Sequence, residues 1–284
     1  MYDFLIDNAN YEMESNILFN KKDGFNAIKT NFPVDGHDVY DNIEEKSFWF
    51  QHRIKCVTEI MKKFIKPKSQ ILDLGGGNGF NTKHLSDLGY DTILMEPSLS
   101  ACKNASKRGV KNIILSILTD DNVKNNSLPN VSMFDVLECV QDDRQTLKTV
   151  YSKLKKGGHL IMVVPAFKSL WSQEDIDIGN VRRFSKKDTE KMLQELGYKI
   201  EYSNYLFEFL FAPIFFERAL KDKIFKRKYD NYTEKKKLID SQHNIGNNAI
   251  VSKGVEFCCN REYKKILKNK KIPFGSSIVI IAKK

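Results

Sequence analysis

Three glycines at alternate positions follow a short apolar segment, and they constrain the fold more than any other feature of the chain. Residues 70–74 are mostly apolar, Gly75, Gly77 and Gly79 come directly after them, and a helical pattern follows. A buried strand that ends in such a turn lets the backbone approach a bound nucleoside where a side chain would collide with it. A second apolar segment about 20 residues further on ends in Glu96, whose carboxylate can accept hydrogen bonds from both ribose hydroxyls. The two features predict a nucleoside cofactor at the edge of an α/β sheet.

The spacing of the glycines separates the classes of nucleoside cofactor. The dinucleotide fingerprint places its third glycine inside the following helix, where this chain has Thr82, so a nicotinamide dehydrogenase is disfavoured. No Lys-Ser or Lys-Thr pair follows the loop, which excludes the phosphate loop of ATPases. The G-x-G-x-G pattern instead resembles the first motif of the class I S-adenosylmethionine-dependent methyltransferases. The resemblance implies S-adenosyl-L-methionine as the cofactor, with Asp73 at its methionine amino group and Glu96 at its ribose.

The predicted cofactor site extends along the same edge of the sheet. Ile117 and Leu118 follow the third predicted strand, where a flat apolar slot for adenine is expected. The predicted cofactor-binding residues are Asp73, Gly75, Gly76, Gly77, Asn78, Gly79, Glu96, Pro97, Ile117, Leu118, Phe134 and Asp135.

The composition indicates an ordinary soluble protein. The chain has 284 residues, of which 41% are hydrophobic and 29% charged. Its five cysteines are odd in number and lack C-x-x-C spacing, which predicts reduced thiols in a cytoplasmic protein and no metal site. The first ten residues carry no basic segment of the kind that opens a secretory signal, and residues 205–220 are too short and too polar to span a bilayer.

The formal net charge of +10 favours anionic partners. Residues 221–237 hold eight Lys or Arg residues against three acids, directly after the apolar stretch. One interpretation is a solvated helix face; the other is contact with a phosphorylated substrate or, through residues 205–237, with a membrane surface. Nothing in the sequence indicates an oligomeric state.

Apolar segments that alternate with helical patterns predict a doubly wound Rossmann-like α/β fold. We expect a seven-stranded methyltransferase sheet with an N-terminal helical segment and a helical cap inserted between the last two strands. The expected units are residues 1–66 (N-terminal segment covering the site), 67–204 (cofactor-binding core), 205–272 (cap) and 273–284 (last strand). The expected strands are residues 70–74, 92–96, 112–115, 131–136, 159–164, 198–204 and 276–282, with helices after residues 78, 97, 141 and 185.

The two added segments are both expected near the cofactor. The sixth strand runs parallel to the first five, so the insertion after it leaves at the carboxyl edge that carries the glycine loop. The N-terminal segment holds a loop at residues 31–38 and then a helix from about Asn42 with Phe48, Trp49, Phe50 and Arg53. Three consecutive aromatic residues cannot share one helix face, so at least one ring should point to a second surface, either the ligand cavity or more of the core.

The later motifs narrow the resemblance. Residues 135–139 read D-V-L-E-C, where many small-molecule methyltransferases read D-V-L-E-H, so Cys139 stands in place of a convenient general base. The F-W-F-x-x-R, L-W-S-x-x-D and closing P-F-G-x-S motifs, and a G-N-V-R-R-F that replaces G-H-x-R-R-Y, resemble a bacterial small-molecule subgroup associated with cell-surface saccharide or lipid assembly. An (N/D)-P-P-(Y/F) turn is absent after Phe134, which argues against methylation of exocyclic amines in nucleic acid and therefore against DNA as a partner.

The substrate residues follow from these motifs. We predict Phe48, Trp49, Arg53, Trp171, Arg182 and Arg183 at the substrate, although each of the last two arginines can instead be a structural partner of an acid such as Asp175 or Asp177. His37 and Tyr40 are the remaining candidates for a catalytic base, which only a hydroxyl nucleophile needs.

The sequence thus predicts O-methyl transfer to a small, anionic metabolite, such as a nucleotide-linked or phosphorylated glycan precursor. The alternatives are an RNA methyltransferase, suggested by the charge but lacking a recognisable RNA-binding appendage, and a non-catalytic protein that binds the nucleoside.

Overall fold

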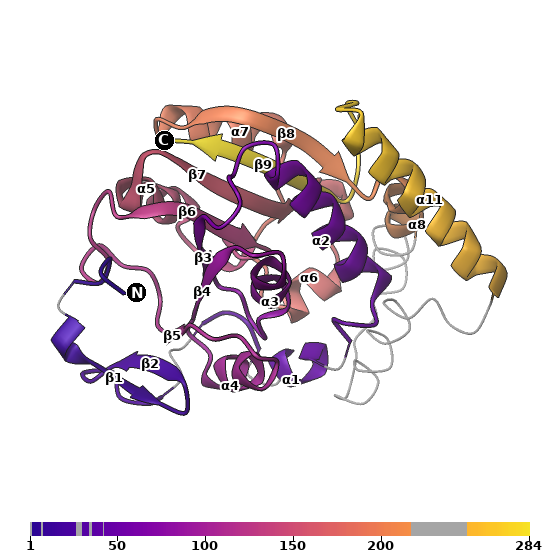
Figure 1. The fold of residues 1–284 in the computed structure, drawn as a ribbon. Helices are drawn as coiled ribbons and strands as arrows, with labels where there is room; N and C mark the ends of the chain where they lie inside the picture. Colours follow the sequence, from indigo (N-terminus) through magenta and orange to yellow (C-terminus); the bar gives the residue numbers. More distant parts are fainter. Residues whose placement is uncertain (1, 7, 27–29, 34–35, 42, 217–248) are drawn as a thin grey trace.

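A single sheet of nine strands organises the molecule, in the order β1-β2-β5-β4-β3-β6-β7-β9-β8 (Figure 1). The computed structural model describes residues 2–6, 8–26, 30–33, 36–41, 43–216 and 249–284. The strands are β1 (Tyr11–Glu14), β2 (Ile17–Asn20), β3 (Gln70–Leu74), β4 (Asp91–Glu96), β5 (Ile113–Leu115), β6 (Leu128–Phe134), β7 (Leu154–Pro165), β8 (Lys199–Leu206) and β9 (Ser277–Lys283).

The helices among the described residues connect and cover these strands. They are α1 (Gly36–Asp41), α2 (Phe48–Met61), α3 (Phe80–Asp87), α4 (Leu99–Lys107), α5 (Asp143–Lys153), α6 (Gln173–Asp177), α7 (Lys186–Glu195), α8 (Phe211–Ile214) and α11 (Ala249–Leu267). Short 3-10 turns are η1 (Asn8–Asn10), η2 (Leu137–Cys139), η3 (Lys168–Leu170) and η4 (Glu208–Leu210).

The central strands are apolar because the sheet is covered on both faces. Four of the five residues of β3 and the first six of β9 are buried. Strand β3 pairs in parallel with β4 and β6, and β6 with β7, whereas β9 runs antiparallel to both β7 and β8. The carboxyl ends of β3, β4 and β6 therefore meet at one edge, and the turns that follow them can build a common site.

All seven expected strands are present, but the expected count of seven is wrong. The hairpin β1–β2 extends the sheet beyond β5, and Ile17 of β2 lies opposite Ile113 in a parallel pairing. Three of the four residues of β1 are exposed and three of the four residues of β2 are buried. Neither strand therefore has the alternation of apolar and polar residues that indicates a strand in the sequence.

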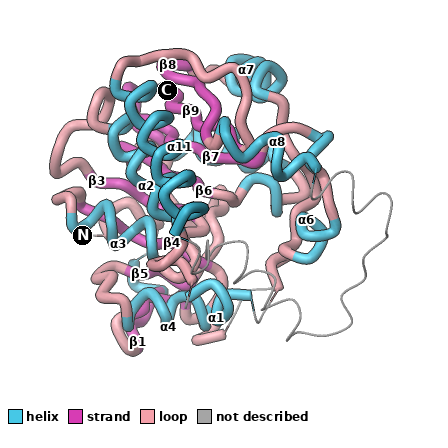
Figure 2. The backbone as a smooth tube through the Cα atoms, turned by 90° about the vertical axis from the view of Figure 1, so that its right-hand side faces the viewer, coloured by secondary structure: helices cyan, strands magenta, loops and turns pink. Residues whose placement is uncertain are grey.

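The N-terminal segment also differs from the expectation. The stretch expected as a loop contains α1, and the following helix α2 begins at Phe48, six residues later than expected. Ser47 is the N-cap of α2 and has extended backbone angles, which ends the preceding turn and starts the helix. Helix α1 lies against α4 in both views (Figure 2).

The insertion between β8 and β9 is helical where the structure describes it. It contributes η4, α8 and α11, and α11 lies beside α2 (Figure 1). The basic residues 221–237, and with them much of the stretch considered for membrane contact, lie outside the described residues. Within the described part of the chain, none of the helices combines the length and the apolar character needed to cross a bilayer.

Candidate functional site

A cavity of about 1340 Å³ opens at the carboxyl edge of the central strands. Its wall combines the turns after β3, β4, β6 and β7 with residues of α2, the insertion and the segment before β9. Sixteen of the residues predicted from the sequence line this cavity: His37, Tyr40, Phe48, Trp49, Arg53, Gly75, Gly76, Gly77, Asn78, Glu96, Pro97, Ile117, Leu118, Phe134, Asp135 and Arg183.

The glycine loop is shaped by its backbone. Gly75 and Gly77 have φ angles of +66° and +55°, in the left-handed region that favours glycine. A Cβ atom on Gly76 would lie 2.2 Å from Leu94 Cδ1 and 2.6 Å from Asp73 Oδ2, so the loop packs directly on the sheet. A Cβ atom on Gly77 would approach only the His37 side chain, at 3.9 Å. The backbone of Gly77 can therefore come close to a ligand in the cavity.

Glu96 links this loop to β4. Its Oε2 accepts a hydrogen bond from the Gly77 amide at 3.0 Å and its Oε1 accepts one from the Ser98 amide at 2.9 Å. Burial raises the pKa of Glu96 to about 7. The carboxylate is thus held by two backbone donors in the wall of the cavity, where its oxygens can also accept from ribose hydroxyls.

Asp73 and Gly79 lie behind the loop and do not line the cavity. Asp73 is fully buried, its carboxylate accepts hydrogen bonds from Thr82 Oγ1 at 2.6 Å and Ser132 Oγ at 2.7 Å, and burial raises its pKa to about 6. Gly79 is the left-handed N-cap of α3, and a Cβ there would lie 2.9 Å from Ala105. In this geometry both residues support the loop from the sheet side.

The two candidates for a catalytic base lie on α1, at the ribose end of the cavity. His37 Nε2 is 3.9 Å from Glu96 Oε1, and burial lowers the pKa of His37 to about 4, so the imidazole is neutral. The Asn78 side chain donates to the His37 carbonyl at 2.8 Å, which fastens α1 to the glycine loop. Tyr40 packs its ring between Phe32 and Phe50. His37 and Tyr40 thus lie beside Glu96 and the aromatic wall of the cavity, and both remain predicted candidates for a base.

Helix α2 presents its three consecutive aromatic residues and one arginine to the cavity. Phe48, Trp49 and Phe50 all line it, as does Arg53, which is 3% exposed. Arg53 Nη1 is paired with the carboxylate of Asp135, whereas its Nε has no hydrogen-bond partner. Burial lowers the pKa of Arg53 to about 10, and the guanidinium stays charged at neutral pH. A buried donor without a partner in the wall of a cavity is available to a ligand oxygen.

Glu138 was not among the predicted site residues, yet it lines the cavity and is 2% exposed. Its Oε2 has no hydrogen-bond partner, and burial raises its pKa to about 8. The D-V-L-E-C motif contains this residue, but the resemblance directs attention to the next position, where related proteins have histidine. Cys139 cannot serve there, since burial raises the pKa of its thiol far above the ordinary value.

Arg182 and Arg183 each pair with an acid. Arg183 Nε donates to Asp175 at 3.0 Å, and Asn180 Nδ2 donates to the other oxygen of the same carboxylate at 3.0 Å; all three residues are buried in the cavity wall. Arg182 pairs with Asp143 at 2.5 Å and does not line the cavity, and neither does Trp171. The structure therefore places Arg183 at the site, and gives both arginines acidic partners.

Three residues other than glycine adopt left-handed backbone angles just after a strand at this edge. They are Asp135 after β6, Phe167 after β7 and Phe207 after β8, with φ between +56° and +61°. Such angles cost free energy in residues with a side chain and persist where the surrounding structure holds them, often around functional sites. Asp135 itself faces the cavity.

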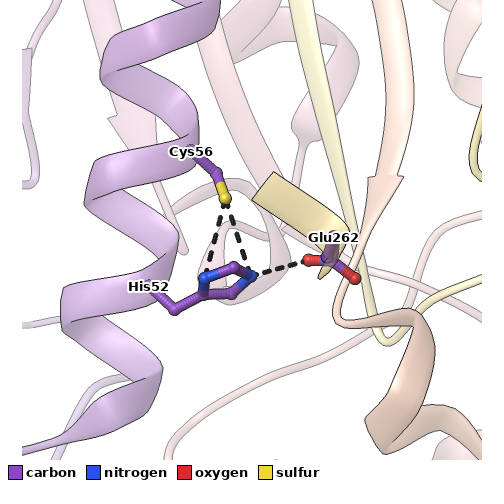
Figure 3. Close-up of side chains that lie close together, drawn as sticks. All are labelled: His52, Cys56 and Glu262. Atoms are coloured by element: carbon purple, nitrogen blue, oxygen red, sulfur yellow. Dashed lines mark hydrogen bonds and ion pairs between the residues drawn. The ribbon is translucent and has the colours of Figure 1, made fainter. Parts of the chain in front are cut away.

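A second cluster, of His52, Cys56 and Glu262, has the residue types of a metal site (Figure 3). The Cys56 sulfur lies 3.6 Å from Nε2 and 3.8 Å from Nδ1 of His52, so it is in line with the lone pair of neither nitrogen. Two ligands of one zinc ion converge on it along their lone pairs, at about 2.0 Å for nitrogen and 2.3 Å for sulfur. The geometry is that of a His52–Glu262 hydrogen bond with a thiol packed against the imidazole ring.

Comparison with known proteins agrees with this fold. A family model described as a methyltransferase domain matches residues 49–203, more than half of the chain, and the protein belongs to that family. Its cofactor is S-adenosyl-L-methionine. No curated protein matches the chain in sequence.

Solved structures share the fold at low sequence identity. A chain of the complex between the Haloferax volcanii Trm112 methyltransferase activator and a methyltransferase superposes with a TM-score of 0.56 and 15% identity, covering 90% of this chain and 99% of that one. Phosphoethanolamine N-methyltransferase 2 of Haemonchus contortus, bound to S-adenosyl-L-methionine, gives 0.54 and 16%, covering 90% of this chain and 58% of that one. A SAM-dependent methyltransferase from Archaeoglobus fulgidus gives 0.50 and 17%, covering 82% and 93%.

The residues present fit this cofactor. The glycine loop allows close approach of its backbone, Glu96 offers acceptors for the ribose, and Ile117 and Leu118 offer an apolar slot for the base. Ligand cavities usually measure about 300 to 1000 Å³, so the volume leaves room for a second small molecule beside the cofactor.

Proposed function

We propose that this methyltransferase transfers a methyl group from S-adenosyl-L-methionine to a hydroxyl oxygen of a small metabolite. The observation that carries the proposal is Glu138: a buried carboxyl group in the cavity wall with one oxygen that lacks any partner. The cofactor supplies an electrophilic methyl group on a sulfonium. A hydroxyl acceptor must lose its proton when the methyl group arrives, and a positioned carboxylate can accept that proton.

Arg53 supports an acceptor that is rich in oxygen. Its unpartnered Nε–H can donate to an acceptor oxygen, while Asp135 holds the other side of the guanidinium. Ser276, whose buried hydroxyl also lacks a partner, lies in the same wall. A donor, a carboxyl group and a hydroxyl suit a polyol or a phosphorylated sugar better than an apolar acceptor.

An anionic acceptor, such as a nucleotide-linked or phosphorylated glycan precursor, is the finer part of this proposal. Its support is the net charge of +10 and the Nε–H of Arg53. Within the described lining, Arg53 and Arg183 are each already paired with an acid, so an acceptor anion would share Arg53 with Asp135.

Transfer of labelled methyl groups tests the proposal. The protein is incubated with methyl-labelled S-adenosyl-L-methionine and a cell extract, which is then separated into small molecules, RNA and protein. We expect the label in the small-molecule fraction. Label in RNA would favour the RNA methyltransferase alternative, and no transfer despite calorimetric binding of S-adenosylhomocysteine would favour a non-catalytic protein.

The Glu138→Gln variant tests the role of the carboxylate. We expect kcat/KM to fall by roughly 10²- to 10⁴-fold, the usual contribution of a positioned base, with little change in affinity for S-adenosylhomocysteine. The wild-type rate should rise with pH through about 8, where Glu138 loses its proton. Glu201→Gln removes a carboxylate that pairs with His159 on the sheet and serves as the control. Equal activity of wild type and Glu138→Gln at every pH would exclude Glu138 as the base.

A further inference from the structure

One buried carboxylate joins three elements beside the cavity. Glu262 of α11 faces His52 of α2, with 2.9 Å between Oε1 and Nε2, and both side chains are less than 5% exposed (Figure 3). The same carboxylate accepts the backbone N–H groups of Phe207 at 2.8 Å and Glu208 at 2.6 Å, where β8 ends. Helix α2, helix α11 and the start of η4 therefore share a single acceptor group.

The backbone that Glu262 holds has an unusual conformation. Phe207 has φ +61° and ψ 47°, a left-handed geometry that a phenylalanine adopts only when its surroundings hold it there. Its amide and that of Glu208 lie at the entry to a 3-10 turn, where backbone donors lack partners within the turn. Glu262 satisfies both amides and so fixes the direction of the chain.

The ring of Phe207 connects this restrained backbone to a residue of the cavity wall. Phe207 is fully buried and stacks on the indole of Trp49, with 3.8 Å between ring centroids and 11° between their planes. Trp49 lines the cavity, whereas Phe207 does not. The imidazole of His52 also contacts Phe207 in an edge-to-face arrangement, with 5.5 Å between centroids.

We infer that Glu262, oriented by His52, is a positioning residue that sets the place of the Trp49 indole in the acceptor end of the cavity. The inference rests on the proposed function only in assigning that end to the acceptor. Phe207 and Glu262 both lie outside residues 49–203 that match the methyltransferase-domain family, so the insertion adds this support to the shared core. A displaced indole is expected to misalign an acceptor while the glycine loop and Glu96 still bind the cofactor.

The experiment uses the chain's own fluorescence as well as its activity. The two tryptophans are Trp49 and Trp171, so Trp171→Phe leaves Trp49 as the reporter. In that background, Glu262→Gln keeps the side-chain shape but replaces one oxygen by an NH₂ group, which cannot accept a backbone N–H. We expect acrylamide quenching of Trp49 to increase about twofold or more.

Activity is measured without the Trp171 change. In Glu262→Gln we expect methyl incorporation into the small-molecule fraction, at limiting extract, to fall about 10- to 100-fold, with the calorimetric affinity for S-adenosylhomocysteine within about twofold of wild type. Saturating extract should recover part of the loss, because a displaced wall weakens binding of the acceptor. Glu262→Asp, which keeps the carboxyl group on a shorter side chain, should be intermediate.

The control variant is Glu59→Gln. Glu59 also joins α2 to α11, through a hydrogen bond from the Tyr263 hydroxyl at 3.2 Å, but it does not contact Phe207. It should leave both Trp49 quenching and activity unchanged. If Glu262→Gln does not fold, Phe207→Leu tests the same path with Glu262 intact.

Two results would overturn the inference. One is unchanged Trp49 quenching in the folded Glu262→Gln or Phe207→Leu protein. The other is an equal loss of cofactor affinity and activity, which would show a general structural role. Because quenching does not depend on turnover, a protein that proves inactive on small molecules can still confirm or refute the positioning of Trp49.

Discussion

Individual polar atoms without partners mark the site at the residue scale. Among the described residues, seven buried side-chain atoms lack a hydrogen bond, and four of them belong to residues that line the cavity: Arg53, Asn81, Glu138 and Ser276. A buried polar atom without a partner costs free energy, so folding alone would not gather four of them in one place. These unpaired donors and acceptors beside the cavity are the groups that we propose to meet the acceptor.

Gly77→Ala and Gly89→Ala form a matched pair that separates strain from ligand contact. Both glycines have positive φ, +55° and +88°, and a Cβ on either meets no atom closer than 3.9 Å. Each substitution should lower the free energy of unfolding by about 1–2 kcal/mol. Only Gly77→Ala should also weaken binding of S-adenosylhomocysteine in calorimetry, by roughly tenfold or more, since its backbone faces the cofactor cavity. Equal affinity of the two variants would mean that the loop does not touch the cofactor.

At the scale of elements, the main feature is one arginine that joins the N-terminal segment to the glycine loop. Arg108, just after α4, donates to Glu44 Oε2 at 2.6 Å, to Asp41 Oδ1 at 2.9 Å and to the Asn78 carbonyl at 2.7 Å. It therefore joins α1, the turn before α2 and the glycine loop. Glu44 is 8% exposed and Arg108 is its charged partner.

Arg108→Ala is expected to release this segment. Removal of one partner of a buried ion pair costs about 3–5 kcal/mol, because the other charge stays buried. Urea unfolding should show that loss, and stopped-flow measurements should show faster dissociation of S-adenosylhomocysteine. Arg144→Ala breaks an exposed pair with Glu195 and should cost less than about 1 kcal/mol. An unchanged dissociation rate in Arg108→Ala would show that α1 does not retain the cofactor.

At the scale of the whole molecule, the site is a set of buried acids that resist ionisation. Burial raises the pKa values of Asp73, Glu96 and Glu138 to about 6, 7 and 8. The molecule thus holds a partly desolvated edge on the sheet, where hydrogen bonds and ion pairs to a ligand are stronger than in water.

The free energy of unfolding of the ligand-free protein should fall as pH rises from 6.5 to 8. Unfolded glutamates lose their protons near pH 4.5, whereas the folded protein retains those of Glu96 and Glu138 up to about pH 7 and 8, so the folded state binds more protons in this range. His37, with its pKa lowered to about 4, has the opposite effect, mainly below about pH 7, where an unfolded histidine binds a proton. The loss should be about 2 kcal/mol and visible in urea unfolding. Glu138→Gln should flatten this dependence; an unchanged slope would mean that Glu138 is not buried as described.

The sequence determined the cofactor loop and the core of the sheet. Gly75, Gly77 and Glu96 act through backbone conformation and strand order, which are local properties with a strong signal in the chain. The seven core strands follow from apolar segments of ordinary length. The hairpin β1–β2 could not be found this way, since it gains its stability by pairing with β5 and not from its own pattern.

Only the tertiary structure decided the surroundings of the cavity beyond the glycine loop. Arg53 pairs with Asp135, which is distant in sequence, and burial sets the pKa of Glu138. Glu262 accepts the Phe207 amide and contacts His52, which lies 210 positions away in the sequence. A sequence motif identifies a residue type at a position, but the desolvation that shifts its pKa depends on how the helices and strands pack around it. For that reason the chain by itself indicated the nucleoside cofactor, and only the fold showed which side chains share one cavity with the glycine loop.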